Sequence, residues 1–245
     1  MKFILTTSDL YRNVVADQAR LFNNFCEVKK EVTVLGFAPP TVELPENYKF
    51  ASMGNQEDFA PREWVGAIRP FIEQIEGEEF AMLWDDLFPI MNFNETLLEE
   101  AKREVRENDV RRVLFHCGSR EQYLSSQRYT ESFNLLSQDA PYRSGLAPGI
   151  WNKQYFLDHL GTNISSWDFE INNHEKMKND GAKMLLCKGP PICEWFNVIR
   201  KGKFHSLHWE KYKNSETGHF GWHRWMRLDK DTAALIQKYE NERLW

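Results

Sequence analysis

Short apolar runs alternate with amphipathic segments along the first half of the chain. Strands are predicted where β-branched, aromatic and other apolar residues cluster, at residues 2–7, 31–37, 49–53, 80–84 and 110–116. Helices are predicted between them, at residues 10–25, 62–76 and 95–108. Pro70 must kink or divide the second helix. The alternation indicates βαβ units, hence an α/β fold with a twisted, Rossmann-like, mostly parallel sheet flanked by helices on both faces.

The pattern changes after residue 117. Helices are predicted near 150–160 and 230–243, and the loops between them are rich in Trp, Gly, Asn and His. We find no internal repeat and no low-complexity tract. We therefore expect one domain, residues 1–245, with a regular half at 1–118 and an irregular half at 119–245.

Composition excludes several classes of protein. A formal net charge of −5 argues against a broad surface for nucleic acid or anionic membranes. No apolar stretch approaches the ~20 residues of a membrane span, and the first residues do not resemble a secretory signal. The 4 cysteines match no common zinc spacing. We expect them to be reduced thiols in a cytoplasmic protein.

The apolar run at residues 80–84 ends abruptly in two adjacent acids, Asp85 and Asp86. Alternation along a strand points their side chains to opposite sides. Two acids at the exit of a buried strand are costly to bury unless a cation lies against them. The carboxyl ends of strands in α/β proteins are also where ligands bind. A divalent cation carrying a diphosphate would suit this position; the alternative is that one acid only caps the next segment.

A second candidate is Thr6-Thr7-Ser8-Asp9, at the turn between the first strand and the first helix. Backbone amides and hydroxyl groups there could hold a nucleobase or a ribose. The segment carries no glycine fingerprint of the dinucleotide-binding or P-loop kind, so those two folds are disfavoured. Simple helix capping is the alternative.

Two further segments suit an acceptor. The loop Tyr142–Lys153 has glycines, a proline and flanking aromatic residues including Trp151, and sugar faces stack well on such side chains. In residues 165–170, Trp167 and Phe169 alternate with Asp168 and Glu170. A carboxylate beside aromatic surface can act as a base towards a hydroxyl. The alternatives are an ordinary structured loop and a solvated acidic turn.

Two motifs lie near the C-terminus. An apolar strand at residues 197–199 leads to Arg200, Lys201 and Lys203, which could neutralise a diphosphate leaving group or form a solvated surface. His219 and His223 have a spacing that suits a metal on a helix. No Glu lies between them and Gly221 weakens a helix, so a metalloprotease-like site is disfavoured.

Taken in order, these segments resemble a family of small glycosyltransferases with the GT-A fold, found often in bacteriophage, viral and bacterial genomes. The resemblance covers about residues 2–205 and rests on the order of its motifs: the opening strand with Thr-Ser-Asp, Val34-Leu-Gly-Phe37, Asp85-Asp86, Tyr142-Arg-Ser-Gly-Leu with Gly149-Ile-Trp-Asn-Lys153, Trp167-Asp-Phe-Glu170 and Asn197–Lys203. The resemblance implies a nucleotide-diphosphate sugar donor, a glycan or other hydroxyl acceptor, and Mn²⁺ or Mg²⁺ at an Asp-x-Asp motif.

The resemblance also implies roles for single residues. Asp85 and Asp86 would take the metal and donor role, with Asp86 the better candidate for coordination. The remaining roles fall to residues near the nucleoside (Thr6, Thr7, Asp9), an acceptor-activating base (Glu170, or Asp168), the diphosphate-facing cations (Arg200, Lys201, Lys203) and acceptor-binding aromatics (Trp151, Trp167). The adjacent acids depart from the usual Asp-x-Asp motif, and His205 or His219 could supply a third metal ligand.

Two other functions fit a similar scaffold. A non-catalytic carbohydrate-binding or virion-associated protein could retain the fold, since fold does not fix function. A sugar nucleotidyltransferase would normally show a glycine-rich, basic loop after the first strand, and Thr6-Thr-Ser-Asp9 is not such a loop.

Overall fold

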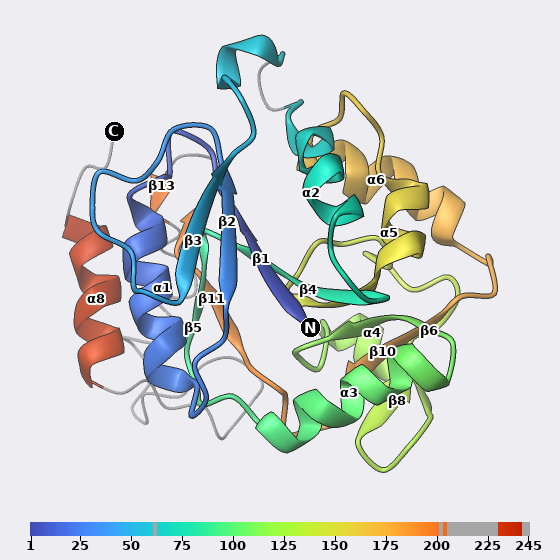
Figure 1. Cartoon of the computed structure of the whole chain (residues 1–245). Coiled ribbons are helices and arrows are strands. Elements are labelled where there is room, and N and C mark those ends of the chain that lie inside the picture. The colour runs from blue at the N-terminus through green and yellow to red at the C-terminus, as the bar shows by residue number, and fades with distance from the viewer. Residues whose placement is uncertain (61–62, 201–202, 205–229, 242–245) are drawn as a thin grey trace.

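The computed structural model describes residues 1–60, 63–200, 203–204 and 230–241, and its centre is one 9-stranded sheet. The strands of this sheet are β1 (Lys2–Thr6), β2 (Val32–Gly36), β3 (Tyr48–Ser52), β4 (Glu79–Trp84), β6 (Val110–Leu114), β7 (Gln127–Arg128), β8 (Phe133–Leu135), β9 (Gly149–Asn152) and β10 (Lys183–Cys187). Their spatial order is β3-β2-β1-β4-β9-β6-β10-β8-β7 (Figure 1). Two small ribbons pair β5 (Leu87–Pro89) with β11 (Trp195–Asn197) and β12 (Ile199–Arg200) with β13 (Lys203–Phe204).

Strands β1 to β4 run parallel, as the sequence predicts. β1 pairs with β2 on one side and with β4 on the other, and β2 pairs with β3. The chain therefore winds outward from β1 to β3 and then returns to the other side of β1. Such a reversal is a topological switch point, where ligands bind in open α/β sheets. The α/β fold with a mixed, mainly parallel sheet is confirmed.

Helices cover both faces of the sheet (Figure 1). They are α1 (Val14–Phe25), α2 (Arg69–Glu73), α3 (Glu95–Glu107), α4 (Arg120–Ser125), α5 (Lys153–His159), α6 (Ser166–Met177) and α8 (Lys230–Asn241), with short 3-10 turns η1 (Gln56–Asp58) and η2 (Val65–Ile68). Apolar residues of α1 and α3 join one core cluster, and those of α2, α5 and α6 join the cluster on the opposite face. Among the described residues, no helix is both long and apolar enough to cross a bilayer.

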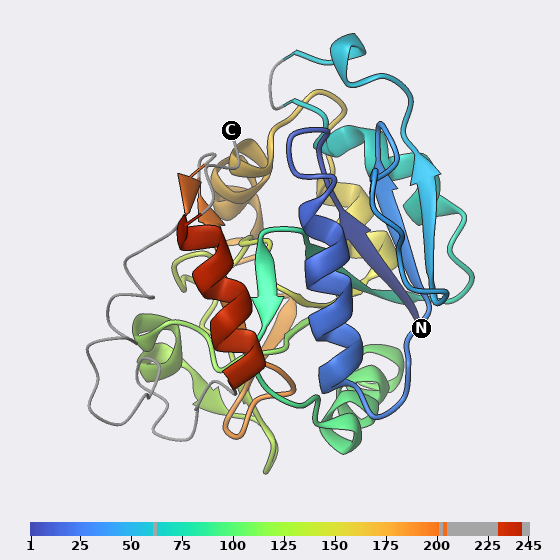
Figure 2. The same ribbon diagram turned by 90° about the vertical axis from the view of Figure 1, so that its left-hand side faces the viewer.

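A third apolar layer lies outside α1, where α8 packs beside it over the β5–β11 ribbon (Figure 2). Phe88 of β5 meets Tyr239 of α8 edge to face at 5.4 Å between ring centroids. The Tyr239 hydroxyl donates to Asp17 Oδ2 on α1 at 2.7 Å. The last described helix is thus fixed to the first helix of the chain.

One strand comes from a segment that we predicted to be a loop. β9 lies between β4 and β6 and pairs antiparallel with both. A Cβ atom at Gly149 would lie 2.4 Å from the Val113 carbonyl oxygen, so glycine is required for this close approach. The sheet is therefore not built from residues 1–118 alone, because β7, β8, β9 and β10 come from the second half and β9 completes its centre.

Two predicted segments differ in local structure. Pro70 divides the helix predicted at 62–76 into the 3-10 turn η2 and the short helix α2, which has this proline in its first turn. Residues 165–170, for which a solvated acidic turn was the alternative, begin α6. Ser165 and Asp168 form a capping box there, a pattern that starts helices and that is readable in the sequence.

Candidate functional site

The switch point between β1 and β4 brings two of the predicted site segments together. Thr6 pairs in register with Trp84, so the next residues on each strand, Thr7 and Asp85, lie side by side. Thr7 Oγ1 donates a hydrogen bond to Asp85 Oδ2 at 2.5 Å. Asp85 is buried, and burial raises its pKa to about 7 against the opposing effect of this hydrogen bond.

Asp86, the next residue, is half-buried at the edge of the same site. Its pKa is raised by burial first, then by the charges of Asp85 and Glu170. Within the described ranges, no Lys or Arg forms an ion pair with either aspartate. Two adjacent acids with raised pKa values are the hard-oxygen donor set that suits a divalent cation. Among the residues that the structure describes, no group of three or more His, Cys, Asp or Glu could hold a metal ion. Further metal ligands would therefore come from outside these residues or from the bound donor.

The segment after β1 is held by its own polar groups. Asp9 Oδ1 accepts from the Ala38 amide at 2.7 Å, and the Asp9 amide donates to Gln56 Oε1 at 2.7 Å. These bonds connect the ends of β1 and β2 to the segment after β3. Thr6 and Thr7 are buried, so contacts from this segment to a ligand would come from the backbone or from Asp9.

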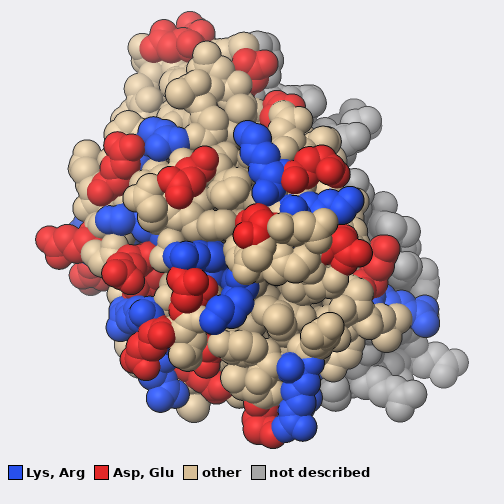
Figure 3. Space-filling view, turned by 90° about the vertical axis from the view of Figure 1, so that its right-hand side faces the viewer, with Lys and Arg blue, Asp and Glu red and all other residues tan. Residues whose placement is uncertain are grey.

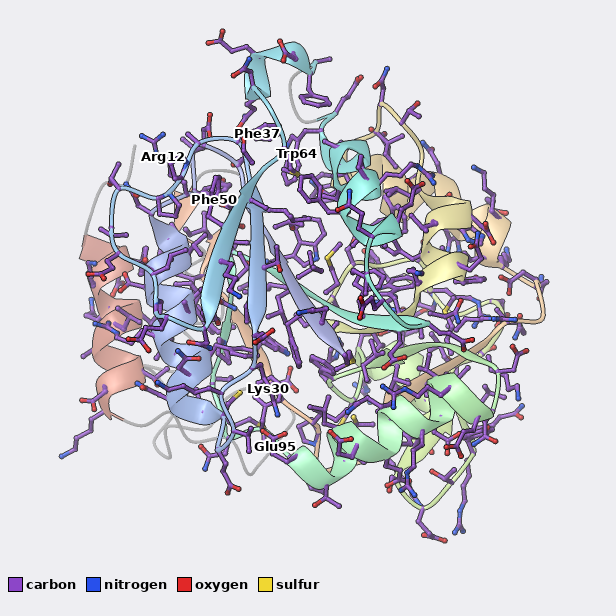
Figure 4. All side chains as sticks on the ribbon, viewed as in Figure 1. Arg12, Lys30, Phe37, Phe50, Trp64 and Glu95 are labelled. Carbon is purple, nitrogen blue, oxygen red and sulfur yellow. The ribbon has the colours of Figure 1, made fainter. Side chains whose placement is uncertain are left out.

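Aromatic residues cluster at the carboxyl ends of β2 and β4, a feature that our sequence interpretation missed; Phe37 and Trp64 are labelled in Figure 4. The Phe37 ring lies 5.9 Å from that of Trp64, which in turn lies 6.5 Å from Trp84. Before Phe37, a Cβ atom at Gly36 would lie 2.8 Å from Thr7 Cγ2. The readable signal was a large aromatic residue at each strand end, Phe37 directly after β2 and Trp84 as the last residue of β4.

Glu170, in the first half of α6, lies near the two acids. Its Oε1 accepts a hydrogen bond from the Leu146 amide at 2.6 Å, and burial raises its pKa. The charge of Glu170 in turn contributes to the raised pKa of Asp86. The fold therefore places the predicted base near the predicted metal-binding acid.

The loop that positions Glu170 rests on a buried arginine that the sequence did not single out. Arg112 of β6 donates to the carbonyl oxygens of Arg143 and Ala147, both at 3.1 Å. Its guanidinium carbon lies 4.3 Å from the centroid of the Trp151 ring, and burial lowers the pKa of Arg112 to about 9. Leu146 lies between those two carbonyls, so its amide is held in place for Glu170.

The structure separates the two base candidates. Asp168 is committed to the N-terminus of α6, where its Oδ2 accepts from the Ser165 amide at 3.1 Å. Hydrogen bonds from Ser165 hold the pKa of Asp168 below its usual value. A raised pKa makes Glu170 the better proton acceptor from a hydroxyl group.

The two tryptophans assigned to the acceptor also differ. Trp151 is 0% exposed in β9 and packs edge to face against Phe156 and Phe169, so assigning it to acceptor binding is wrong. The error arose because a tryptophan in a glycine-rich segment resembles a surface residue, whereas the fold places Trp151 in the centre of the sheet. Trp167 is 45% exposed on α6, one turn before Glu170.

The basic segment is only partly described. Arg200 and Lys203 pair across the β12–β13 ribbon by their backbones. Lys201, His205, His219 and His223 lie outside the described residues.

No protein-family model and no curated protein matches the chain. Among solved structures, TarS 1-349 of S. aureus in complex with UDP-GlcNAc matches with a TM-score of 0.52 and 14% identity, covering 84% of this chain and 60% of that chain. The same fragment in complex with UDP matches with a TM-score of 0.52 and 11% identity, over 82% of this chain and 62% of that chain.

TarS is a GT-A glycosyltransferase, so this chain has an α/β fold that matches GT-A glycosyltransferase structures. The chain spans about three fifths of the length of the TarS fragment that it matches.

Proposed function

We propose that this protein is a glycosyltransferase that moves a sugar from a nucleotide-diphosphate sugar to an acceptor hydroxyl. The observation that carries the proposal is the placement of Asp85 and Asp86 at the switch point of a GT-A-like sheet, with Glu170 near enough for its charge to raise the pKa of Asp86. Asp86 suits the donor side of the reaction, and Glu170 suits the acceptor side. The UDP and UDP-GlcNAc bound by TarS support a uridine-diphosphate sugar as the first donor to test.

The donor would lie over the carboxyl ends of β1, β2 and β4. Asp9 and the backbone after β1 would contact the nucleoside, beside the aromatic residues Phe37 and Trp64. Asp86, supported by Asp85, would hold Mn²⁺ or Mg²⁺, and Arg200, Lys201 and Lys203 would face the diphosphate. A bound divalent cation supplies positive charge that stabilises a departing diphosphate.

Glu170 would activate the acceptor. Its carboxylate takes the proton of the acceptor hydroxyl while that oxygen forms a bond to the anomeric carbon. The bond between the anomeric carbon and the diphosphate oxygen breaks, and its electron pair leaves with the diphosphate. The Leu146 amide donates its hydrogen bond to Glu170 Oε1. The other oxygen of this carboxylate, Oε2, would therefore accept that proton.

A thermal-shift screen of nucleoside diphosphates, with and without Mn²⁺, tests this proposal. A ligand at about 100 times its Kd stabilises the native state by about 2.7 kcal/mol, which for a chain of this size raises Tm by roughly 5–10 °C. We expect UDP with Mn²⁺ to produce such a shift. Uridine with Mn²⁺, and Mn²⁺ alone, are the controls. If no nucleoside diphosphate raises Tm in the presence of the cation, the proposed function is wrong.

A further inference from the structure

Beside Glu170, one aromatic side chain is exposed on a strained backbone. Tyr142 has a φ of 55° and is 69% exposed. The other non-glycine residues with positive φ in the described ranges are Asp109 and Asn179, whose short polar side chains favour this conformation. Tyrosine has no such preference, and an exposed ring gains little from burial. Folding alone therefore does not explain why a tyrosine occupies this position.

The strained backbone is held firmly by its neighbours. Three successive carbonyl oxygens each accept a hydrogen bond: that of Pro141 from Gln122 Nε2 at 2.9 Å, that of Tyr142 from the Gly145 amide at 2.8 Å, and that of Arg143 from Arg112 at 3.1 Å. Arg143, the next residue, is completely buried. Strain fixed by its surroundings in this way is typical of ligand-binding sites.

Tyr142 is also close to the proposed base. A Cβ atom at Gly145 would lie 3.4 Å from Tyr142 Cβ and 3.7 Å from Glu170 Oε1, so glycine leaves the space between them open. On α6, Trp167 lies one turn before Glu170. Ile171 directly follows Glu170, and 62% of its surface is exposed. Exposed apolar surface thus flanks the carboxylate on the loop and on the helix.

We propose that Tyr142 and Trp167 form the acceptor subsite and that the acceptor is a carbohydrate. One sugar ring would stack on Tyr142 and direct a hydroxyl towards Glu170. Flat aromatic side chains with a polar edge suit the C–H faces and hydroxyl groups of a sugar ring. On the molecular face that carries α5 and α6, acidic and basic side chains are interspersed, which suits a neutral glycan better than a polyanion (Figure 3). The inference rests on the proposed function.

Two variants separate the ring from the backbone. Tyr142→Gly removes the ring and adopts a positive φ without strain, so we expect its Tm to be no lower than that of the wild type. Tyr142→Phe keeps the stacking face. Val28→Ala changes an apolar residue with 61% exposure outside the site and serves as the control.

Saturation-transfer NMR with maltotriose, cellotriose and chitotriose tests the subsite. We expect at least one trisaccharide to bind the wild type, Tyr142→Phe and Val28→Ala, and to bind Tyr142→Gly on the order of 3–10-fold more weakly. Binding of UDP with Mn²⁺ should be equal in all four proteins. If no trisaccharide binds the wild type, or if Tyr142→Gly binds as well as the wild type, the subsite is wrong. If the wild type does not bind UDP in the presence of Mn²⁺, the proposed glycosyltransferase function is wrong instead.

Discussion

Replacing Glu170 with Gln is expected to lower glycosyl transfer by ~10²–10⁴-fold, the usual contribution of a positioned general base. The amide oxygen of Gln can still accept the hydrogen bond from Leu146, which is 2.6 Å in the wild type. Burial raises the pKa of Glu170, so its ionised form is disfavoured in the fold, and an uncharged side chain should not reduce stability. The measurement is UDP release from the donor that the thermal-shift screen identifies.

Two matched variants make this result specific to Glu170. Glu175→Gln changes an exposed glutamate on the same helix and should retain normal turnover. Asp168→Asn should also retain it, apart from a weaker start to α6. Loss of turnover in Asp168→Asn with normal turnover in Glu170→Gln would move the base to Asp168. Normal turnover in both would show that this segment is structural.

The second large effect concerns stability. Trp151→Ala is expected to destabilise the protein by about 3–5 kcal/mol, since it empties a large buried volume in the centre of the sheet. The Trp151 ring is 0% exposed, and its loss would also remove the partner of the Arg112 guanidinium, 4.3 Å from the ring centroid. Urea denaturation measures the change in the free energy of unfolding.

Trp167→Ala provides a control with the same change of residue. Because Trp167 is 45% exposed, its replacement should change the free energy of unfolding by only about 0.5 kcal/mol, as for most surface substitutions. A Trp151→Ala variant as stable as Trp167→Ala would contradict the placement of β9 between β4 and β6.

The first half of the fold could be predicted because its elements repeat a simple period. Strands β1 to β4 are short apolar runs and α1 and α3 are amphipathic, so local pattern and tertiary structure agree. β9 carries no such signal. It has 4 residues, it follows a glycine- and proline-rich loop, and its partners β4 and β6 come from distant parts of the sequence.

The residues of the candidate site also fall into those that could be identified from the sequence and those that could not. Asp85 and Asp86 could be identified because two acids that end an apolar strand conflict with the local pattern. The role of Arg112 could not, since one arginine in a strand resembles a surface residue, and only the fold places it under the loop that holds Glu170. The exposed, strained Tyr142 was equally hidden, because backbone conformation in a loop depends on the hydrogen bonds around it.

The central claim is that Asp86 forms a cation-dependent site for a nucleoside diphosphate. Asp86→Ala removes a half-buried carboxylate, the proposed oxygen ligand, without emptying core volume, and Asp86→Asn removes the charge at constant size. Asp158→Ala, at an exposed position on α5, is the control. Changes to outer-shell groups alone typically lower metal affinity 10–100-fold, so loss of a direct ligand should cost about 100-fold or more.

Calorimetric titration of UDP in the presence of Mn²⁺ is the most direct test. The wild type and Asp158→Ala should bind UDP with equal affinity, and this binding should disappear when the cation is removed with a chelator. Asp86→Ala and Asp86→Asn should show weakened or undetectable binding at the same protein concentration. Equal UDP affinity in the wild type and both Asp86 variants, or UDP binding that is unchanged without the cation, would contradict the proposed site.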